Sequence, residues 1–333
     1  MHGRYLGALW ALAAALAAAL LLAAPAGATV VSLTFDDAFA DQMPAASMLG
    51  AAGLPATFFV MSSAVGQTGH LTAADLAALK AAGHEIGGHT LDHADLPTLG
   101  PDDQRHEICD DRQALLALGT QAAVFAYPYG HFDASAQAIA RSCGYTAARE
   151  SGGLAAPGGC WGPCPAAETL PPADPFAIRS AASIKSTVGL ADLQQLVLSA
   201  EATGGWLTLT FHHVCTDCGT YATDPSVLAA FAAWLAPRRA SGTAVLTMSQ
   251  ALLQPAAPVA PAAEPPAAPV PAPAAPVGRR PRRRCPAAVT SHRHRRSHHV
   301  PARCRAGARG VRARRWPATT YLTSTARSAA ARH

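Results

Sequence analysis

Short apolar runs alternate with helical patterns along residues 30–249 of this 333-residue chain. The runs have the length of buried strands, and the segments between them carry apolar residues at three- and four-residue spacing. This alternation is typical of βα units arranged around a parallel sheet or barrel. One barrel-sized α/β domain is therefore the simplest architecture for this part of the chain.

The individual elements follow from the same pattern. The expected strands are 30–34, 56–61, 85–88, 122–126, 146–149, 177–180, 206–211 and 244–247. The expected helices are 73–82, 102–118, 134–142, 190–200 and 225–235. Gly83 directly after the first of these helices indicates a helix stop.

Residues 1–28 have the features of an export signal. His2 and Arg4 precede an apolar run over 6–24, and the small residues of 26–28 suit a signal peptidase. A membrane anchor is the alternative, because the run is nearly long enough to span a bilayer. We expect cleavage, no stable membrane span afterwards, and a protein that is secreted, extracellular or associated with the cell wall.

The composition changes sharply after the expected barrel domain, 29–253. Residues 254–277 are almost only Pro, Ala and Val, which predicts an extended linker. Residues 278–333 hold 16 Arg and no Asp or Glu, so the net charge of +5 conceals an acidic remainder at −11, from 10 Lys and Arg against 21 Asp and Glu. Little apolar content predicts disorder in this tail.

The basic tail suggests attraction to anionic cell-wall polymers such as teichoic acids, an effect that salt weakens. Nucleic acid is not expected as a partner of an exported protein. The alternatives are a solvated tail without a partner, or a misread coding end.

Six cysteines precede the tail, an even number that predicts three structural disulfides in an exported protein. Cys109 and Cys143 flank neighbouring helices and are expected to pair, as are Cys160 and Cys164 across a Gly-rich loop. The spacing of 215 and 218 also suits a second zinc site or a redox motif, but export favours a local disulfide.

Acidic and imidazole side chains follow the expected strands. Asp36 and Asp37 end the first strand, where barrel folds place catalytic groups. His89 and His93 follow the third strand, and imidazoles four residues apart converge on one cation if the segment turns helically. Asp37 with these two histidines would leave open positions for water and substrate, as a catalytic metal site requires.

Two later strands lead into further candidates at the same rim. The loop around Tyr129 contains Pro128 and Gly130, which fix an unusual backbone path that can aim an amide at a substrate. His212 ends the seventh strand and is a candidate proton donor.

Together these segments resemble the polysaccharide deacetylase family with the NodB homology domain, carbohydrate esterase family 4. The resemblance covers residues 30–252. Its motifs appear in order as TFDD at 34–37, HTLDH at 89–93, YPYG at 127–130 and LTFH at 209–212.

The resemblance implies a distorted (β/α) barrel and a role for each motif residue. Asp36 is the implied general base and His212 the implied general acid, while the Tyr129 amide helps to stabilise the oxyanion. Asp37, His89 and His93 are the implied ligands of a divalent metal, with zinc expected and cobalt, nickel or iron also suited to these ligands.

The chain departs from the family pattern at one position of the third motif. The family has an Arg two residues before the Pro, where this chain has Ala126, so another group must orient Asp36. Arg179 is our candidate, and Arg149 is the alternative. The family's fourth motif, Asp-x-x-x-Trp, is also not found.

The implied activity is hydrolysis of N-acetyl groups on an N-acetylglucosamine-containing polymer, which gives acetate and a free amine. Variants without the motif Arg occur among deacetylases of bacterial exopolysaccharides, and peptidoglycan and chitin oligomers stay open as substrates. An O-acetyl esterase acting on xylan is the near alternative. A non-catalytic module that binds glycan or cell wall, and a secreted polyanion-binding protein, are the alternatives from other classes.

Overall fold

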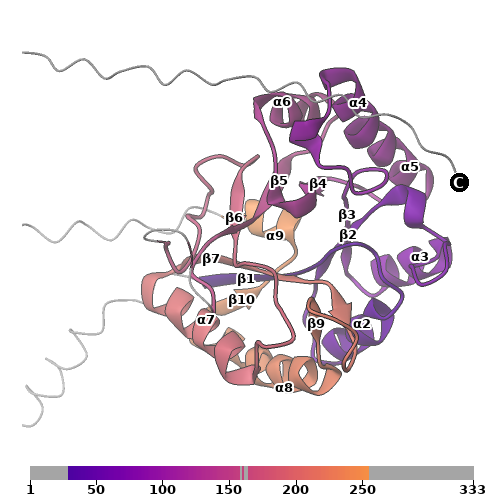
Figure 1. Ribbon diagram of the computed structural model, residues 1–333. Helices are drawn as coiled ribbons and strands as arrows, with labels where there is room; N and C mark the ends of the chain where they lie inside the picture. Colours follow the sequence, from indigo (N-terminus) through magenta and orange to yellow (C-terminus); the bar gives the residue numbers. More distant parts are fainter. Residues whose placement is uncertain (1–28, 158–159, 161–163, 255–333) are drawn as a thin grey trace, which may run out of the picture. The chain divides into compact units, whose positions relative to one another are not determined.

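The computed structural model describes residues 29–157, 160 and 164–254 (Figure 1). The expected signal peptide, the linker beyond Gln254 and the basic tail lie outside the described residues, so these domain boundaries stay predictions. Among the described helices, none has the length and apolar character needed to cross a membrane.

The main sheet contains eight strands, and all of its recorded pairings are parallel. They are β1 (Thr29–Phe35), β2 (Thr57–Val60), β3 (Glu85–Gly88), β4 (Val124–Ala126), β5 (Ala147–Gly153), β6 (Ile178–Ser180), β7 (Gly205–Phe211) and β10 (Thr243–Val245). These strands overlap the eight runs expected from the sequence.

Strand β1 is the centre of the sheet. It pairs with β7 along its whole length, while β10 and β2 share its other edge, and β3 to β6 continue from β2. The chain after β6 then reaches back to β7, because Ala181 N donates to Thr208 O at 2.9 Å and Ile184 N donates to Thr210 O at 2.8 Å. The sheet thereby closes almost completely, which confirms the predicted distorted barrel.

Apolar side chains fill both sides of the strands, as expected for a parallel sheet covered by helices. Val31 and Phe58 belong to the large cluster that includes buried helix residues. Their neighbours Val30 and Phe59 belong to a smaller cluster with Trp206 and residues of helix α9 (Met248–Leu252), which fills the inside of the barrel. The barrel is therefore a packed core whose strands can hold catalytic groups rigidly at one rim.

Within the described residues, seven further α-helices precede α9, and Figure 1 shows α2, α3, α7 and α8 outside the strands. They are α2 (Gln42–Ala51), α3 (Ala73–Ala81), α4 (Pro101–Arg105), α5 (Asp111–Ala117), α6 (Ala134–Ser142), α7 (Leu190–Thr203) and α8 (Pro225–Leu235). A π-helical turn over 106–110 interrupts the helix expected at 102–118.

Helix α2 was not predicted from the sequence. Its buried residues, Gln42, Ala45, Ala46 and Leu49, are spaced like one helical face. Three of these four are small or polar, so the apolar pattern that marks a buried face is weak here.

The three disulfides have the predicted pairing. Cys109 joins Cys143, Cys160 joins Cys164 and Cys215 joins Cys218, with Cα–Cα distances of 5.2, 6.2 and 6.0 Å. The last of these closes the turn between two short paired strands, β8 (His213–Val214) and β9 (Ala222–Thr223).

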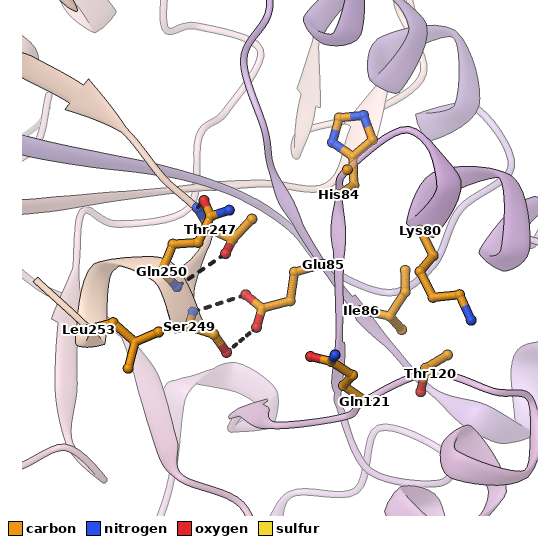
Figure 2. Close-up of a pocket in the computed structure, with 11 residues that line it drawn as sticks. Lys80, His84, Glu85, Ile86, Thr120, Gln121, Thr247, Ser249, Gln250 and Leu253 are labelled. Carbon is orange, nitrogen blue, oxygen red and sulfur yellow. Dashed lines mark hydrogen bonds between the residues drawn. The ribbon is translucent and has the colours of Figure 1, made fainter.

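A hollow of about 310 Å³ lies where β3 begins, beside α9 (Figure 2). Its carboxylate, Glu85, accepts hydrogen bonds from Thr57 Oγ1 at 2.8 Å and from Ser249 N at 3.2 Å. These bonds attach α9 to the strands. Because Glu85 is already bound in this way, we assign the hollow a structural role.

Candidate metal and catalytic site

Three potential metal ligands converge at the carboxyl end of the strands. Asp37 follows β1, while His89 and His93 follow β3. Asp37 Oδ1 lies 3.4 Å from His89 Nε2 and 3.3 Å from His93 Nε2. The ligand atoms of all three residues lie within 4.8 Å of one another. The structure thus brings together the three residues that the sequence predicts as metal ligands.

The segment from His89 to His93 is not the helical turn that its spacing suggested. Thr90 and His93 have positive φ values of 66° and 67°, and Thr90 Oγ1 accepts a hydrogen bond from His93 N at 2.9 Å. This tight loop turns both imidazoles toward Asp37. Left-handed backbone at two non-glycine residues is uncommon and is often found at functional sites.

The donor set fits a divalent cation. His89 Nδ1 lies 2.7 Å from Ala126 O, so that nitrogen donates to the carbonyl and Nε2 keeps its lone pair for a cation. Asp37 Oδ1 is buried and accepts no hydrogen bond of normal geometry from the described residues. A cation between these atoms would satisfy that oxygen, and two His with one carboxylate suit zinc and other transition metals.

The pKa shifts of Asp37 and His93 favour cation binding, whereas that of His89 opposes it. Burial raises the pKa of Asp37, but His89, His212 and His93 together hold it well below its usual range. Burial lowers the pKa of His93, and the neighbouring His89 lowers it further. Burial also lowers the pKa of His89, but Asp37 and Asp36 together outweigh burial and raise it. A cation therefore competes with a proton on His89.

Two acids on one helical segment hold the loop from His89 to His93. Glu107 Oε2, in the π-helical turn, accepts hydrogen bonds from Leu91 N at 3.1 Å and Asp92 N at 3.4 Å. Asp111 Oδ2 accepts from His89 N at 3.2 Å, and burial raises the pKa of Asp111 to about 7. Both ends of the metal-binding loop are therefore attached to this segment.

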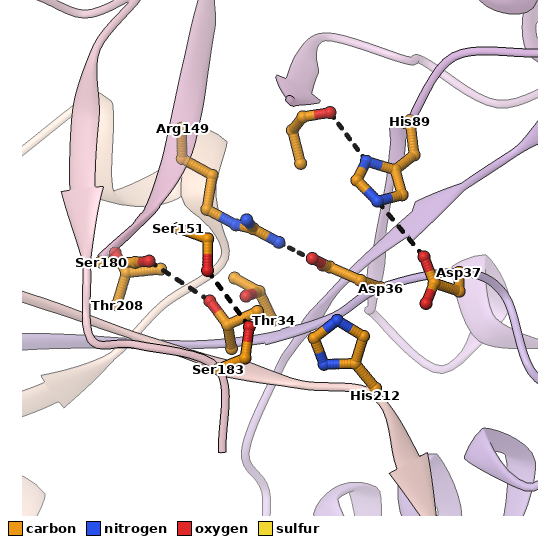
Figure 3. Close-up of polar contacts among 12 residues, drawn as sticks. Thr34, Asp36, Asp37, His89, Arg149, Ser151, Ser180, Ser183, Thr208 and His212 are labelled. Atoms are coloured by element: carbon orange, nitrogen blue, oxygen red, sulfur yellow. Dashed lines mark hydrogen bonds and ion pairs between the residues drawn. The ribbon is translucent and has the colours of Figure 1, made fainter. Parts of the chain in front are cut away.

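Asp36, the predicted base, is paired with Arg149 (Figure 3). Arg149 Nη2 donates to Asp36 Oδ1, and both side chains are almost fully buried. The guanidinium carbon also lies 4.7 Å from the centre of the Phe59 ring. Because a buried carboxylate needs a charged partner, this contact pairs Asp36 with a cation and orients it.

Our preferred partner for Asp36, Arg179, is wrong, and the alternative Arg149 makes the contact. Arg179 Nε lies 2.7 Å from Glu168 Oε2, and its Nη2 lies 2.7 Å from Glu168 Oε1. The bidentate pair directs Arg179 away from Asp36. Arg149 pairs in the sheet with Ala126, the position where the family motif has its Arg. Strand β5, which neighbours the motif strand β4, therefore supplies the guanidinium from the same level of the sheet.

His212 lies on the other side of Asp36, directly after β7 (Figure 3). Gln42 Nε2 donates to the backbone oxygens of Asp36 at 2.6 Å and of His212 at 3.0 Å, so it ties the two segments together. Burial lowers the pKa of His212, although Asp36 and Asp37 oppose this. His212 Nδ1 is buried and has no hydrogen-bond partner among the described residues.

Tyr129 stands at the mouth of the site. Its φ of 59° reflects the sharp turn between Pro128 and Gly130. The ring is 58% exposed and its centre lies 4.5 Å from that of His93 in an edge-to-face contact. The backbone at Tyr129 therefore follows the unusual path that the sequence predicted, and the ring is available to a ligand.

The site opens into a groove of about 570 Å³. The predicted residues that line it are Asp36, Asp37, His89, His93, Tyr129 and His212. Ser151, Ser183, Lys185 and Tyr221 also line it and were missed, since they belong to no motif and to no expected element. His131 lines it as well.

A second group of potential ligands lies beside the groove. Asp41, His213, Cys215 and Cys218 bring their ligand atoms within 4.8 Å of one another. His213 Nδ1 lies 2.7 Å from Asp41 Oδ2, and the two sulfurs form a disulfide. In this oxidised form the sulfurs are not thiolate ligands, so the group is a structural one.

Several solved structures of carbohydrate-active enzymes resemble the fold. A family 4 carbohydrate esterase from Streptomyces lividans has a TM-score of 0.43 and 18% identity, covering 66% of this chain and 92% of that chain. A family 4 acetyl xylan esterase from Clostridium thermocellum has a TM-score of 0.47 and 18% identity, covering 67% of this chain and 90% of that chain.

Sequence comparisons find relatives of part of this chain. YxkH of Bacillus subtilis, named as a candidate polysaccharide deacetylase, is 30% identical over 117 residues, 34% of this chain and 42% of that protein. The uncharacterized protein SCO4760 of Streptomyces coelicolor is 36% identical over 120 residues, 35% of this chain and 46% of that protein. Each match spans less than half of the relative's length. The polysaccharide deacetylase family model matches residues 23–148, which carry the first three motifs, so this part of the chain is similar to that family.

Proposed function

We propose that this protein is a metal-dependent hydrolase that removes N-acetyl groups from an N-acetylglucosamine-containing polysaccharide. One observation carries the proposal: a buried carboxylate held by an arginine, Asp36 with Arg149, lies between a three-ligand cation site and His212 at one groove. A base, a cation site and a proton donor around one groove are the groups that amide hydrolysis requires.

Asp37, His89 and His93 would hold the divalent cation, for which zinc is the default. When bound, the cation supplies Lewis acidity toward the acetyl carbonyl and makes water more acidic. Asp36 takes a proton from the attacking water, and the Arg149 guanidinium orients this carboxylate.

The other groove residues act on the acetyl group and on the leaving nitrogen. The Tyr129 amide hydrogen-bonds the carbonyl oxygen as negative charge develops there. His212 donates a proton to the nitrogen as the C–N bond breaks, because an unprotonated amide nitrogen leaves poorly. Water is consumed, and acetate and a free amine are formed.

The location of the protein is part of the proposal. Three disulfides link described cysteines, and such bonds persist in oxidising compartments outside the cytosol. With the export signal expected at 1–28, they support a secreted or cell-wall-associated enzyme. The arginines of the tail would attract anionic wall polymers, an attachment that salt should weaken.

Acetate release by the purified protein tests the function. Substrates are N-acetylglucosamine oligomers, peptidoglycan and acetylated xylan, each with added zinc or with chelator. The proposal predicts release from an aminosugar polymer that chelator and Asp36→Asn each abolish, while Asp102→Asn on the exposed face of α4 has no effect. Release from xylan alone would identify an O-acetyl esterase. No release from any substrate would instead favour a module that binds glycans.

A further inference from the structure

One wall of the groove contains two residues that the hydrolytic mechanism does not use. Tyr221 is 47% exposed, and its ring centre lies 5.4 Å from that of His212. Lys185 Nζ lies 5.9 Å from the centre of the same ring. Both residues line the groove. Tyr129 stands beside His93, so the two exposed tyrosines flank the reacting centre on different sides.

Backbone hydrogen bonds hold the Tyr221 segment in place. His213 N donates to Tyr221 O at 3.2 Å, and Cys215 N donates to Thr223 O at 3.1 Å. Ser186 N donates to Thr220 O at 2.8 Å, which joins the chain beside Lys185 to the chain beside Tyr221. The backbone segments that carry Lys185 and Tyr221 are therefore joined to each other.

Side chains of the second ligand group support the same wall. The His213 ring stacks on Phe39 with centres 3.6 Å apart, and Asp41 Oδ1 accepts from Val214 N at 3.2 Å. The Cys215–Cys218 disulfide closes the turn that leads to Tyr221. A preorganised wall binds a ligand with a smaller ordering cost than a mobile loop does.

Lys185 is an unpaired cation in this groove. Among residues 29–157, 160 and 164–254, no carboxylate lies within ion-pair distance of its Nζ, whereas Arg149 is paired with Asp36 and Arg179 with Glu168. An ammonium that has no carboxylate partner among the described residues and lines a ligand groove favours a ligand carrying negative charge.

The neighbouring ring supplies the complementary surface. An exposed tyrosine face packs against apolar surface such as the C–H groups of a sugar ring, and its hydroxyl remains free for hydrogen bonding. We infer that Tyr221 and Lys185 form a subsite for an acidic sugar, whose ring packs on Tyr221 and whose carboxylate or phosphate faces Lys185. The inference rests on the proposed function, since it places this sugar next to the residue that loses its acetyl group.

The test compares soluble oligosaccharides of equal length that are neutral, carboxylated or phosphorylated. The neutral one is an N-acetylglucosamine oligomer, the carboxylated one alternates N-acetylglucosamine with N-acetylmuramic acid, and the third carries phosphate esters. Dissociation constants are measured by calorimetry on the full chain with Asp36→Asn, alone or combined with Lys185→Ala, Lys185→Arg or Tyr221→Ala. Lys80→Ala is the matched control, because Lys80 lies outside the groove. Every variant keeps the basic tail, so differences in dissociation constant between variants arise from the groove.

The expected result is a charge-specific loss. Lys185→Ala should weaken binding of a charged oligomer about threefold to fivefold and leave the neutral oligomer within about twofold. Lys185→Arg should retain the preference, and Tyr221→Ala should weaken all three oligomers about threefold to tenfold. Whichever charged oligomer shows the loss identifies the anionic group.

An equal effect of Lys185→Ala on neutral and charged oligomers, or no effect on any of them, would overturn the inference. Acetate release by the unmutated protein is measured in parallel. If none is released, the proposed function fails, while the binding data still decide whether the subsite exists. If acetate is released without any dependence on charge, only the subsite is wrong.

Discussion

Arg149 reaches Asp36 from the strand next to the one that carries the family's third motif. The two residues are 113 positions apart, and Arg149 is the sheet partner of Ala126. The guanidinium that the family pattern places before the Pro is therefore replaced by one from β5. Asp36 therefore has an arginine partner although the motif Arg is absent from this chain.

Replacement of Arg149 should lower the turnover rate more than it disturbs the other residues of the site. For Arg149→Ala we expect kcat for acetate release to fall tenfold or more, because Asp36 loses the group that orients it. Arg149→Lys should restore part of the loss, since a buried ammonium keeps the charge without the fork.

Arg179→Ala is the control, because Arg179 binds Glu168 instead. It should leave kcat within about twofold. A larger loss in Arg179→Ala than in Arg149→Ala would contradict the assignment. Thermal unfolding of each variant separates turnover from stability, because an unpaired buried Asp36 costs about 3–5 kcal/mol.

Glu107 should influence metal affinity although it is not a ligand. Its carboxylate accepts from two backbone amides of the metal-binding loop, so Glu107→Ala should weaken zinc binding about tenfold to 100-fold. Glu107→Gln keeps one acceptor oxygen and should lose less. The measurement is competition for zinc with a chromophoric chelator. Asp110→Ala, an exposed change on the same π-helical turn, should bind zinc like the unmutated chain.

His84 should make the fold sensitive to mild acid. Burial lowers its pKa below 6.5, and Ala56 N donates to its Nδ1 at 3.1 Å, which requires the neutral ring. The unfolded chain therefore binds more protons, so stability is fully present above pH 6.5 and is lost as pH falls toward the folded-state pKa.

The slope of the unfolding free energy against pH tests this assignment. His84 can contribute at most about 1.4 kcal/mol per pH unit, and His84→Asn should remove its share. Gln195→Asn, an exposed change that removes no titrating group, should leave the slope unchanged. Equal slopes for the unmutated chain and His84→Asn between pH 6.5 and 5 would show that His84 is not the sensor.

The disulfides should differ in their contribution to stability. Cys109–Cys143 spans 34 positions and Cys215–Cys218 spans 3, so loop-closure entropy predicts about 4 kcal/mol for the first and about 2 kcal/mol for the second. Paired Cys→Ala variants measured by denaturant unfolding would show the order. A larger cost for the shorter loop would mean that native contacts near Tyr221 dominate over chain entropy.

The sequence by itself determined the strands and the three candidate metal ligands. Each apolar run is continuous in the chain, and burial on both faces of a parallel sheet requires such runs. Asp37, His89 and His93 directly follow strands, so the parallel arrangement brings them to one rim. Their chemistry could be read because the required residues and spacings are local.

Tertiary structure alone decided which arginine meets Asp36. Ala147 and Ile178 both face the inside of the barrel, so two-residue alternation turns Arg149 inward and Arg179 to the other face. In the sequence Ala147 and Ala148 are equally apolar, and nothing in the chain marks which one faces inward. Lys185 and Tyr221 also could not be found from the sequence. They meet because the barrel closes between β6 and β7, and because a disulfide-closed turn lies over the rim.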